Sequence, residues 1–459
     1  MALRFKTTAD IPIPSDPFER IVGQEKAVKF AKIAAKQKRH LLLVGPPGTG
    51  KSLIAKAMAS VLPKPTQQIS VFPNEKNQNR PILKIETPEE VGEKEEKELG
   101  KLVHPFEVPS EVAEELGYRC RRCFELSPPS VEFCPSCGAK KQPEALLDVF
   151  GGKLKRKKSI SVGGVVYDAY DEGRIRILSE EEAKRIREGG ILPKKKVLVP
   201  LNRSTFVQVV GATEAELLGD VEHDPYGGHS EIGIPAYLRV VPGAVHEAHE
   251  GVLFIDELSS LSKSLQKSIL TAMQEKKFPI TGRSPGSTGA VVKVENVPCD
   301  FILVGALNMT DLESVLPALR NRIKGDGYEV LMDVFMEDNA RNREKLAQFV
   351  AQEVFLDGRI PHAKKDAVDE IVHYAKKVAK CIDDVNGLTL RLRTLTGIIR
   401  LAGDIAVEEN SGYIERKHVK NAIENAKSIE EQISEKYQTA YRAGIADYGT
   451  EEKKQSGIV

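Results

Sequence analysis

Short apolar runs alternate with helical stretches in two separate parts of the chain. Continuous apolar runs occur within 39–45 (RHLLLVG), 252–255 (VLFI) and 301–307 (FILVGAL). Such runs are typical of strands that are buried on both faces of a parallel sheet. A glycine-rich turn and a helical stretch, residues 48–62, follow the first run, which is the strand–loop–helix order of an α/β fold. The pattern predicts a parallel α/β sheet with flanking helices.

In the C-terminal part of the chain, the apolar residues recur at a different spacing. From about residue 331, apolar residues recur at three- and four-residue spacing, which predicts helices. Four stretches carry this pattern, at 342–354, 365–380, 392–409 and 417–429. We therefore predict an all-α lid domain over 331–443, followed by a polar tail at 444–459 that we expect to be flexible.

A change of composition interrupts the α/β pattern. Residues 89–101 (EEVGEKEEKELGK) are dense in charge, whereas 159–170 and 194–201 suit β-strands. The pattern of the first part resumes near residue 205. We predict an α/β nucleotide-binding domain formed by 1–74 and 201–330, with residues 75–200 as an insertion.

The composition bears on the cellular location expected for the protein. The chain has 459 residues, 41% of them hydrophobic, and a formal net charge of +1. It contains no apolar run of the length that a membrane span needs and no apolar signal-peptide core. We expect a cytoplasmic protein without a membrane partner, in which clustered cysteines bind metal rather than form disulfides.

The clearest chemical motif is GPPGTGKS, which matches the phosphate-binding pattern G-x-x-x-x-G-K-[ST]. Its glycines let backbone N–H groups face phosphates, and the following helix directs its positive end at them. Lys51 is expected to reach the β- and γ-phosphates, and Ser52 to ligate Mg²⁺. The predicted ATP- or GTP-binding residues of this segment are Gly45, Pro46, Pro47, Gly48, Thr49, Gly50, Lys51, Ser52 and Leu53.

Polar residues follow two of the predicted strands. Asp256 and Glu257 come directly after 252–255, and Asn308 follows 301–307. Ligands of open α/β sheets bind at the carboxyl ends of the strands. We expect Asp256 to hold Mg²⁺, Glu257 to activate the attacking water, and Asn308 to touch the γ-phosphate or that water.

Two pairs of arginines are candidates for stabilising the transition state. Arg320 and Arg322 lie in LPALRNRI, and Arg391 and Arg393 lie in LTLRLRTLTGIIR. An arginine that reaches a neighbouring subunit's γ-phosphate accelerates hydrolysis by about 10³–10⁵-fold. The alternative for Arg320 and Arg322 is a solvated helix end, whereas one of Arg391 and Arg393 could reach back to the nucleotide from the helical domain.

Four cysteines form the spacing C-x₂-C-x₁₀-C-x₂-C: Cys120, Cys123, Cys134 and Cys137. Two such knuckles can surround Zn²⁺ with four thiolates, which predicts a closed, structural zinc ribbon at about 117–140. Iron–sulfur ligation and unligated thiols are the alternatives. We interpret Cys299 and Cys381 as small buried apolar residues.

The stretch HEAHE, 246–250, superficially resembles a metalloprotease helix. Its two histidines, His246 and His249, are three residues apart, whereas the zinc-protease helix spaces them four apart on one face. The sequence therefore predicts no metal site there.

Taken together, these motifs resemble an AAA+ ATPase, and more narrowly the ATPase module of the archaeal-type Lon proteases. The resemblance rests on IVGQEKAV, QKRHLLLVGPPGTGKS, GVLFIDELSSLSKSLQKSILTAMQEKKFPITG, PALRNRIKGDGYEV and LTLRLRTLTGIIRLAGDIAV, and it covers 16–72 and 205–430. The Ser-Lys protease dyad of that family has no counterpart that we can identify in this sequence. Members of that family carry a membrane-spanning insertion between the phosphate-binding loop and the acidic strand, and residues 75–200 occupy the corresponding position here.

The resemblance implies further residue roles. Ile21, Val22 and Gly23 would lie by the adenine. Arg322 matches the family's trans-acting arginine better than Arg320 does, and Arg393 matches its second sensor. The segment AYLRVVPG resembles the first pore loop, in which Tyr237 and Leu238 would grip polypeptide; core packing of Tyr237 is the alternative.

The expected function is an ATP-driven ring motor, a homo-hexamer that unfolds, translocates or remodels polypeptides, alone or with a separate protease partner. One alternative is an AAA+ motor that translocates nucleic acid, since zinc ribbons bind nucleic acids and GKLKRKK, 152–158, is basic. Another is a chelatase-type ATPase chaperone.

Overall fold

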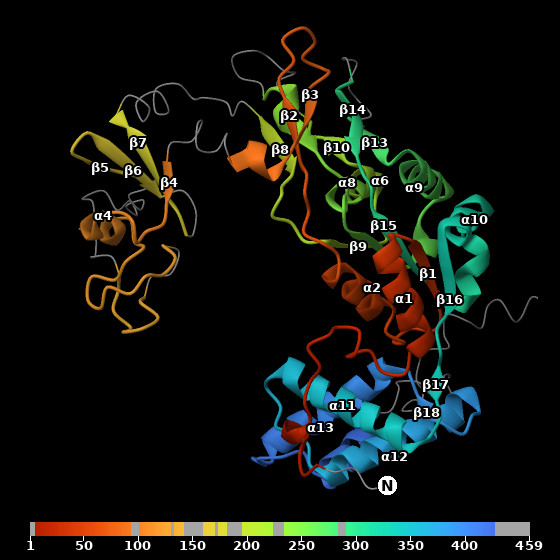
Figure 1. The fold of residues 1–459 in the computed structure, drawn as a ribbon. Helices are drawn as coiled ribbons and strands as arrows, with labels where there is room; N and C mark the ends of the chain where they lie inside the picture. Colours follow the sequence, from red (N-terminus) through yellow and green to blue (C-terminus); the bar gives the residue numbers. More distant parts are fainter. Residues whose placement is uncertain are drawn as a thin grey trace, which may run out of the picture.

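The computed structural model describes residues 5–92, 101–129, 133–141, 159–169, 173–180, 195–223, 234–282 and 291–426. Figure 1 shows three parts: a central sheet with flanking helices, a helical body formed by the C-terminal part of the chain, and a separate small body built from the insertion. The predicted tail at 444–459 lies outside the described residues. No helix among the described residues combines the length and apolarity needed to cross a bilayer.

The central sheet has five parallel strands in the order β16-β1-β15-β12-β9. The apolar runs seen in the sequence become strands that are buried on both faces, as expected for parallel sheets. The strands are β1 (His40–Val44), β9 (Phe206–Val210), β12 (Val252–Asp256), β15 (Ile302–Leu307) and β16 (Gly327–Leu331). The predicted α/β fold is confirmed.

Helices cover both faces of this sheet. On one face, α1 (Glu25–Gln37) and α2 (Lys51–Ser60) pack through a row of alanines and Ile54. The other face is covered by α6 (Glu214–Leu218), α8 (Ala244–Glu247), α9 (Lys263–Glu275) and α10 (Pro317–Asp326). Short helices η2 (Leu258–Ser260) and η3 (Met309–Ser314) follow β12 and β15. We call this sheet and its helices the α/β body.

The helical body contains the four helices that the apolar spacing predicts. They share one core and are α11 (Ala340–Asp357), α12 (Lys365–Asp383), α13 (Leu392–Glu408) and α14 (Arg416–Asn425). A small ladder, β17 (Phe335–Met336) with β18 (Leu388–Thr389), closes one end. The N-terminal lead also joins this body, since η1 (Thr8–Asp10) bonds to it through the amide of Thr8 and the carbonyl of Ala363.

The insertion begins and ends in a small sheet that is tied to the α/β body. Strands β2 (Gln68–Phe72), β3 (Ile82–Glu86) and β8 (Lys196–Val199) form this sheet in the order β3-β2-β8. Its core continues into the hairpin β13 (Lys277–Thr281) with β14 (Lys293–Pro298), into α7 (Ala236–Arg239), and into the ladder β10 (Asp220–Val221) with β11 (Val240–Val241). The predicted strand at 194–201 is β8.

The distal part of the insertion, which we call the four-cysteine module, has its own core. It contains a four-stranded antiparallel sheet, α4 (Ser110–Glu115) and the four cysteines. The strands are β4 (Lys101–Val103), β5 (Ser159–Val162), β6 (Val165–Ala169) and β7 (Ile175–Ser179). The predicted β-structure at 159–170 is the β5–β6 hairpin, whose two turn glycines, Gly163 and Gly164, have φ of +60° and +80°.

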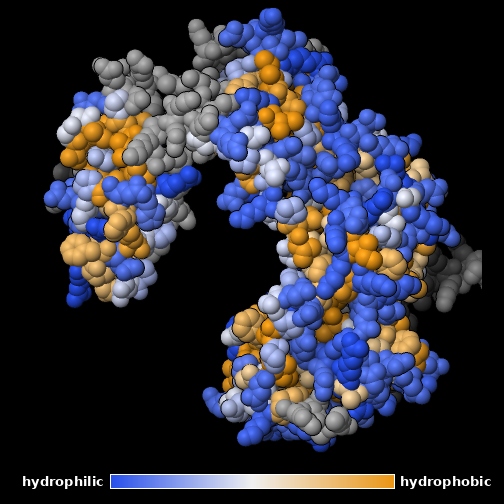
Figure 2. All heavy atoms as spheres, in the orientation of Figure 1, coloured by the Kyte–Doolittle hydropathy of each residue, from blue (hydrophilic) through white to orange (hydrophobic). Residues whose placement is uncertain are grey.

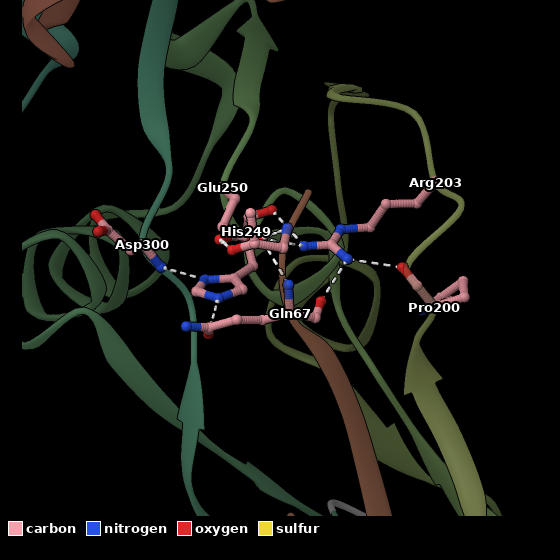
Figure 3. Close-up of polar contacts among 7 residues, drawn as sticks. Gln67, Pro200, Arg203, His249, Glu250 and Asp300 are labelled. Atoms are coloured by element: carbon pink, nitrogen blue, oxygen red, sulfur yellow. Dashed lines mark hydrogen bonds and ion pairs between the residues drawn. The ribbon is translucent and has the colours of Figure 1, made fainter. Parts of the chain in front are cut away.

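A buried guanidinium ties both ends of the insertion to the α/β body (Figure 3). Arg203 donates to the carbonyl oxygens of Gln67 (2.8 Å), Pro200 (2.7 Å) and His249 (3.0 Å), and it forms an ion pair with Glu250 at 3.3 Å. The Glu250 carboxylate also accepts from the backbone amide and hydroxyl of Thr66. These contacts hold the entry to β2, the exit from β8 and the start of β12 at one point.

We predict that Arg203→Met destabilises the protein by about 3 kcal/mol, because it leaves the Glu250 carboxylate and three carbonyl oxygens without their shared donor. The measurement is the urea midpoint of the full chain. Lys276→Met is the matched control, since its ion pair with Asp300 is largely exposed and should contribute less than about 1 kcal/mol. Equal midpoints for the two variants would contradict the importance of the buried contacts.

Candidate nucleotide site and four-cysteine centre

The phosphate-binding loop connects the end of β1 to the start of α2. Gly48 and Gly50 adopt φ of +79° and +90°, in the left-handed region that favours glycine. A Cβ atom on Gly48 would lie 2.8 Å from the Cβ of Arg393. The backbone amide of Leu392 donates to the Gly48 carbonyl at 3.1 Å. The glycines therefore let the loop turn and let the start of α13 approach it closely.

Lys51 points its ammonium group back into this loop. Its Nζ donates to the carbonyl oxygens of Gly45 (2.6 Å) and Pro46 (3.0 Å), and the buried Thr49 hydroxyl also donates to Pro46 at 2.9 Å. Desolvation lowers the pKa of Lys51, while the nearby charge of Asp256 opposes this shift. A partly desolvated ammonium beside the amino end of a helix is suited to bind phosphate.

The two acidic residues lie where β12 ends. Asp256 is its last residue, and Glu257 follows with φ of +52°, a left-handed conformation that is uncommon for glutamate. The backbone amide of Glu257 donates to Oδ1 of Asp256 at 3.2 Å. Residues held in such conformations cluster at functional sites.

The predicted site residues meet in one cavity of about 110 Å³ at the carboxyl edge of the sheet. Pro47, Gly48, Gly50, Lys51, Ser52, Asp256, Glu257, Asn308 and Arg393 line it together with Ala306 and Leu307. Pockets for whole small molecules usually measure about 300–1,000 Å³, so this space suits phosphates. The geometry that the sequence predicts for Lys51, Asp256, Glu257 and Asn308 is present.

Other predicted nucleotide-binding residues occupy the junction of the two bodies. Ile21 packs in the core of the α/β body, whereas Val22 packs in that of the helical body. A Cβ on Gly23, which has φ of +72°, would come within 2.3 Å of Leu390. Leu53 is half exposed on α2. Their contact with adenine or ribose stays a prediction.

The structure separates the two arginines of each pair. Arg391 forms an ion pair with Asp383 at 2.7 Å, whereas Arg393 lines the cavity. Arg320 makes two bonds to the Glu329 carboxylate, at 2.6 and 3.2 Å. Arg393 is therefore the member of its pair that can meet a nucleotide bound in the same chain.

Arg322 lies at the opposite edge of the sheet. It forms an ion pair with Asp326 at 2.8 Å, and its Nε is buried without a hydrogen-bond partner. With His40, Gly251 and Ile302, at the amino ends of the strands, it lines a second cavity of about 400 Å³. An arginine at this edge faces away from the nucleotide cavity of its own chain.

The proposed pore residues are packed in this conformation. Tyr237 is 7% exposed among the apolar side chains of β2, β8, β13 and β14, and Leu238 is partly buried against the same cluster. This arrangement corresponds to the core-packing alternative. The pore role of both residues stays a prediction.

The four cysteines converge as their spacing predicts. Their sulfur atoms all lie within 4.8 Å of one another, with Sγ–Sγ distances of 3.6 Å for Cys120–Cys137 and 3.5 Å for Cys123–Cys134. Four sulfurs placed tetrahedrally about 2.3 Å from Zn²⁺ would be about 3.8 Å apart. The donor set therefore fits a tetrahedral metal ion.

Backbone amides favour the thiolate form of two cysteines. The amide of Cys123, followed by that of Arg122, lowers the pKa of Cys120 to about 6. Cys134 has a lowered pKa for the same reason, with the amide of Cys137 as the largest cause.

The two cysteines outside the module were both predicted to be buried. Cys299 is buried as predicted, but Cys381 is exposed on α12, so its interpretation as a buried residue was wrong.

The histidines of HEAHE have structural roles. His246 accepts from the Gly243 amide through Nδ1 and donates from Nε2 to the Phe278 carbonyl; burial lowers its pKa to about 4. His249 accepts from the Asp300 amide and contacts Gln67 (Figure 3). The four cysteines are the one metal-ligand group found among the described residues.

Sequence reasoning missed two residues that join distant segments. Arg203 reads as an ordinary loop arginine. Gln24, also buried, both donates to the carbonyl and accepts from the amide of Asp333, at 2.8 and 3.0 Å, and so fastens the start of α1 to the chain entering the helical body. A charged or amide residue just outside a helix or strand carries no local signal for such long-range contacts.

Comparison with known proteins shows the family of this chain. A Lon protease homolog of Methanothermobacter thermautotrophicus is 45% identical over 472 residues, covering 97% of this chain and 94% of the relative. The chain belongs to the family of Lon protease homologs. It is an AAA+ ATPase related to the archaeal Lon proteases. The archaeal Lon protease of Thermococcus kodakarensis is 40% identical to this chain, and the alignment covers 95% of this chain and 63% of that protein.

Shorter matches concern parts of this Lon homolog. Residues 17–91 match the family described as magnesium chelatase, subunit ChlI, and residues 236–295 match the Sigma-54 interaction domain. A solved structure of Thermotoga maritima RuvB aligns with 97% of this chain and 89% of its own, at 12% identity and a TM-score of 0.40.

We predict that the purified protein contains one Zn²⁺ per chain and that Cys134→Ala releases it, because three thiolates leave the tetrahedron open. Elemental analysis measures the metal. Cys381→Ala, which removes an exposed thiol, should keep the full content. Iron with acid-labile sulfide would instead identify an iron–sulfur centre.

Proposed function

We propose that this Lon homolog is an ATP-hydrolysing ring motor that unfolds, translocates or remodels polypeptides, as a homo-hexamer. The observation that carries the proposal is the cavity in which Lys51, Asp256, Glu257, Asn308 and Arg393 meet. This set combines cationic, acidic and amide groups from the carboxyl edge of the sheet with an arginine from the helical body in one cavity. Phosphoryl transfer depends on such positioning and charge stabilisation.

Each residue has a distinct task in hydrolysis. Lys51 binds the β- and γ-phosphates, which replace its present carbonyl partners. Glu257 accepts a proton from the attacking water, and Asn308 orients that water or the γ-phosphate. Ser52 and Asp256 would hold Mg²⁺, which neutralises phosphate charge when bound. Arg393 links the nucleotide to the helical body, so that this body responds to the state of the phosphates.

The placement of Arg322 supports a trans role for it. It lies at the amino edge of the sheet, whereas the nucleotide cavity of the same chain lies at the carboxyl edge. A neighbouring copy that presents its carboxyl edge to this amino edge would bring its γ-phosphate to Arg322. Arg320 is less suited to that task because Glu329 already holds it by two bonds.

The polypeptide substrate is inferred from the family. Lon proteases act on proteins, and the segment with Tyr237 and Leu238 resembles their first pore loop. Gripping a substrate would require this segment to leave its apolar cluster. The match of residues 17–91 to the magnesium chelatase subunit favours a chelatase-type chaperone as the second candidate.

We predict that an unfolded polypeptide stimulates ATP hydrolysis several-fold, because a motor turns over faster when it carries its load. Steady-state ATPase rates are measured with reduced, carboxymethylated lysozyme, with single-stranded DNA, and with neither. Stimulation by DNA alone would replace the proposal with a nucleic-acid motor. An unchanged rate in all three conditions would favour the chelatase-type alternative.

We predict that Glu257→Gln and Arg322→Ala each reduce the ATPase rate by at least about 10²-fold while ATP still binds. Mixing the two inactive proteins should restore activity. The intact Glu257 of one subunit then meets the intact Arg322 of its neighbour at roughly a quarter of the interfaces of a randomly mixed ring. ATPase rates of subunit mixtures test this. An inactive mixture, with subunit exchange verified by mass, would place Arg322 outside the shared site.

A further inference from the structure

The two cysteine knuckles of the four-cysteine module are built alike. In the first, the amide of Phe124 donates to the Cys120 carbonyl at 2.9 Å, and the amide of Cys120 donates to Glu125 at 2.9 Å. In the second, Gly138 donates to Cys134 at 2.9 Å, and Cys134 donates to Ala139 at 2.8 Å. The same turn therefore occurs twice, which allows a comparison of equivalent positions within one chain.

The residue after the second cysteine of each knuckle adopts the left-handed conformation. Gly138 has φ of +67°, and Phe124 has φ of +62°. Glycine accepts this conformation at no steric cost, whereas a bulky side chain is strained there. The second knuckle uses the residue that the turn favours, and the first one does not.

Core packing does not compensate for this strain. Phe124 is 60% exposed, so its ring gains little from burial within the module. A strained residue that the local structure does not need points to a role outside the fold. Glycine at this position would satisfy the turn equally well.

A second exposed phenylalanine lies next to the other knuckle. Phe133 directly precedes Cys134 and is 56% exposed. Phe124 follows Cys123 and Phe133 precedes Cys134, two cysteines whose sulfurs are 3.5 Å apart. We call these two residues the phenylalanine pair. Figure 2 shows apolar side chains on the surface of this module.

The charges around the pair help to identify its ligand. Arg121 and Arg122, both exposed, are next to it in the first knuckle. The described part of the module also carries carboxylates, among them Glu107, Glu111, Glu114, Glu115 and Glu125. Binding of single strands needs a positively charged groove that follows the phosphates, and this mixture of charges does not provide one. Aromatic residues with arginine are typical of protein interfaces.

We propose that the phenylalanine pair, with Arg121 and Arg122, is a capture site for an apolar segment of an unfolded polypeptide. The inference rests on the proposed function, because it names where the motor first holds its substrate. The pair inserts into the apolar segment, and the arginines favour substrates with acidic residues beside it. A segment of this kind is buried in folded proteins, which gives selectivity for the unfolded state.

The decisive variant is Phe124→Gly in the full chain. Because glycine relieves the strain of the knuckle turn, the variant should keep its zinc, its basal ATPase rate and its thermal stability. Its affinity for fluorescein-labelled, reduced and carboxymethylated lysozyme, measured by anisotropy, should fall by about tenfold, as expected for the loss of one buried phenylalanine. Phe133→Ser should have a similar effect.

Phe106→Ser is the matched control. This phenylalanine is 73% exposed in another turn of the same module, and its removal should change the affinity by less than about twofold. Unchanged affinity in Phe124→Gly, or loss of zinc from it, would overturn the capture site. A fall in affinity for single-stranded DNA instead would assign the pair to nucleic acid. Continued ATPase stimulation by polypeptide in a variant with unchanged affinity would leave the proposed function standing without this site.

Discussion

The close contact between the phosphate-binding loop and the start of α13 is the constraint on which the active arrangement depends. The amide of Leu392 bonds to the Gly48 carbonyl, and the Cβ of Arg393 lies where a side chain on Gly48 would be. Any residue other than glycine would push the helical body away from the loop. Arg393 lines the cavity next to this contact, so the absence of a Cβ at Gly48 brings the two bodies together at the nucleotide cavity.

The rest of the junction supports that contact. Gln24 pairs with the backbone of Asp333 on the chain that leaves the central sheet, and Gly23 accommodates Leu390 of the helical body. These contacts join the residues just before α1 to the chain just after β16 and just before α13. A ligand that alters the loop can therefore act on the helical body through several short, directional contacts, as the proposed motor would require.

The features that could be predicted from the sequence are those that depend on a local pattern of residues. Buried parallel strands are continuous apolar runs, so their ends, and with them Asp256 and Asn308, could be placed in advance. The cysteine spacing likewise fixed the converging sulfurs. Contacts between distant segments had no such signal. The role of Arg203 depends on carbonyl oxygens from three separate segments, and the burial of Tyr237 depends on a sheet formed by the two ends of the insertion. Cys381 was judged by residue type alone, whereas the face of α12 on which it lies decides its exposure.

The clamp at Arg203 has a consequence for how this family can vary. One guanidinium binds the carbonyl of Gln67, where the chain departs, and that of Pro200, where it returns, so the long excursion between them starts and finishes at the same place. Closing a loop whose ends are already joined depends only weakly on its length, about 0.6 kcal/mol for each doubling. The excursion is thus a replaceable cassette, and evolution could exchange its contents while the ATPase beneath it stayed intact.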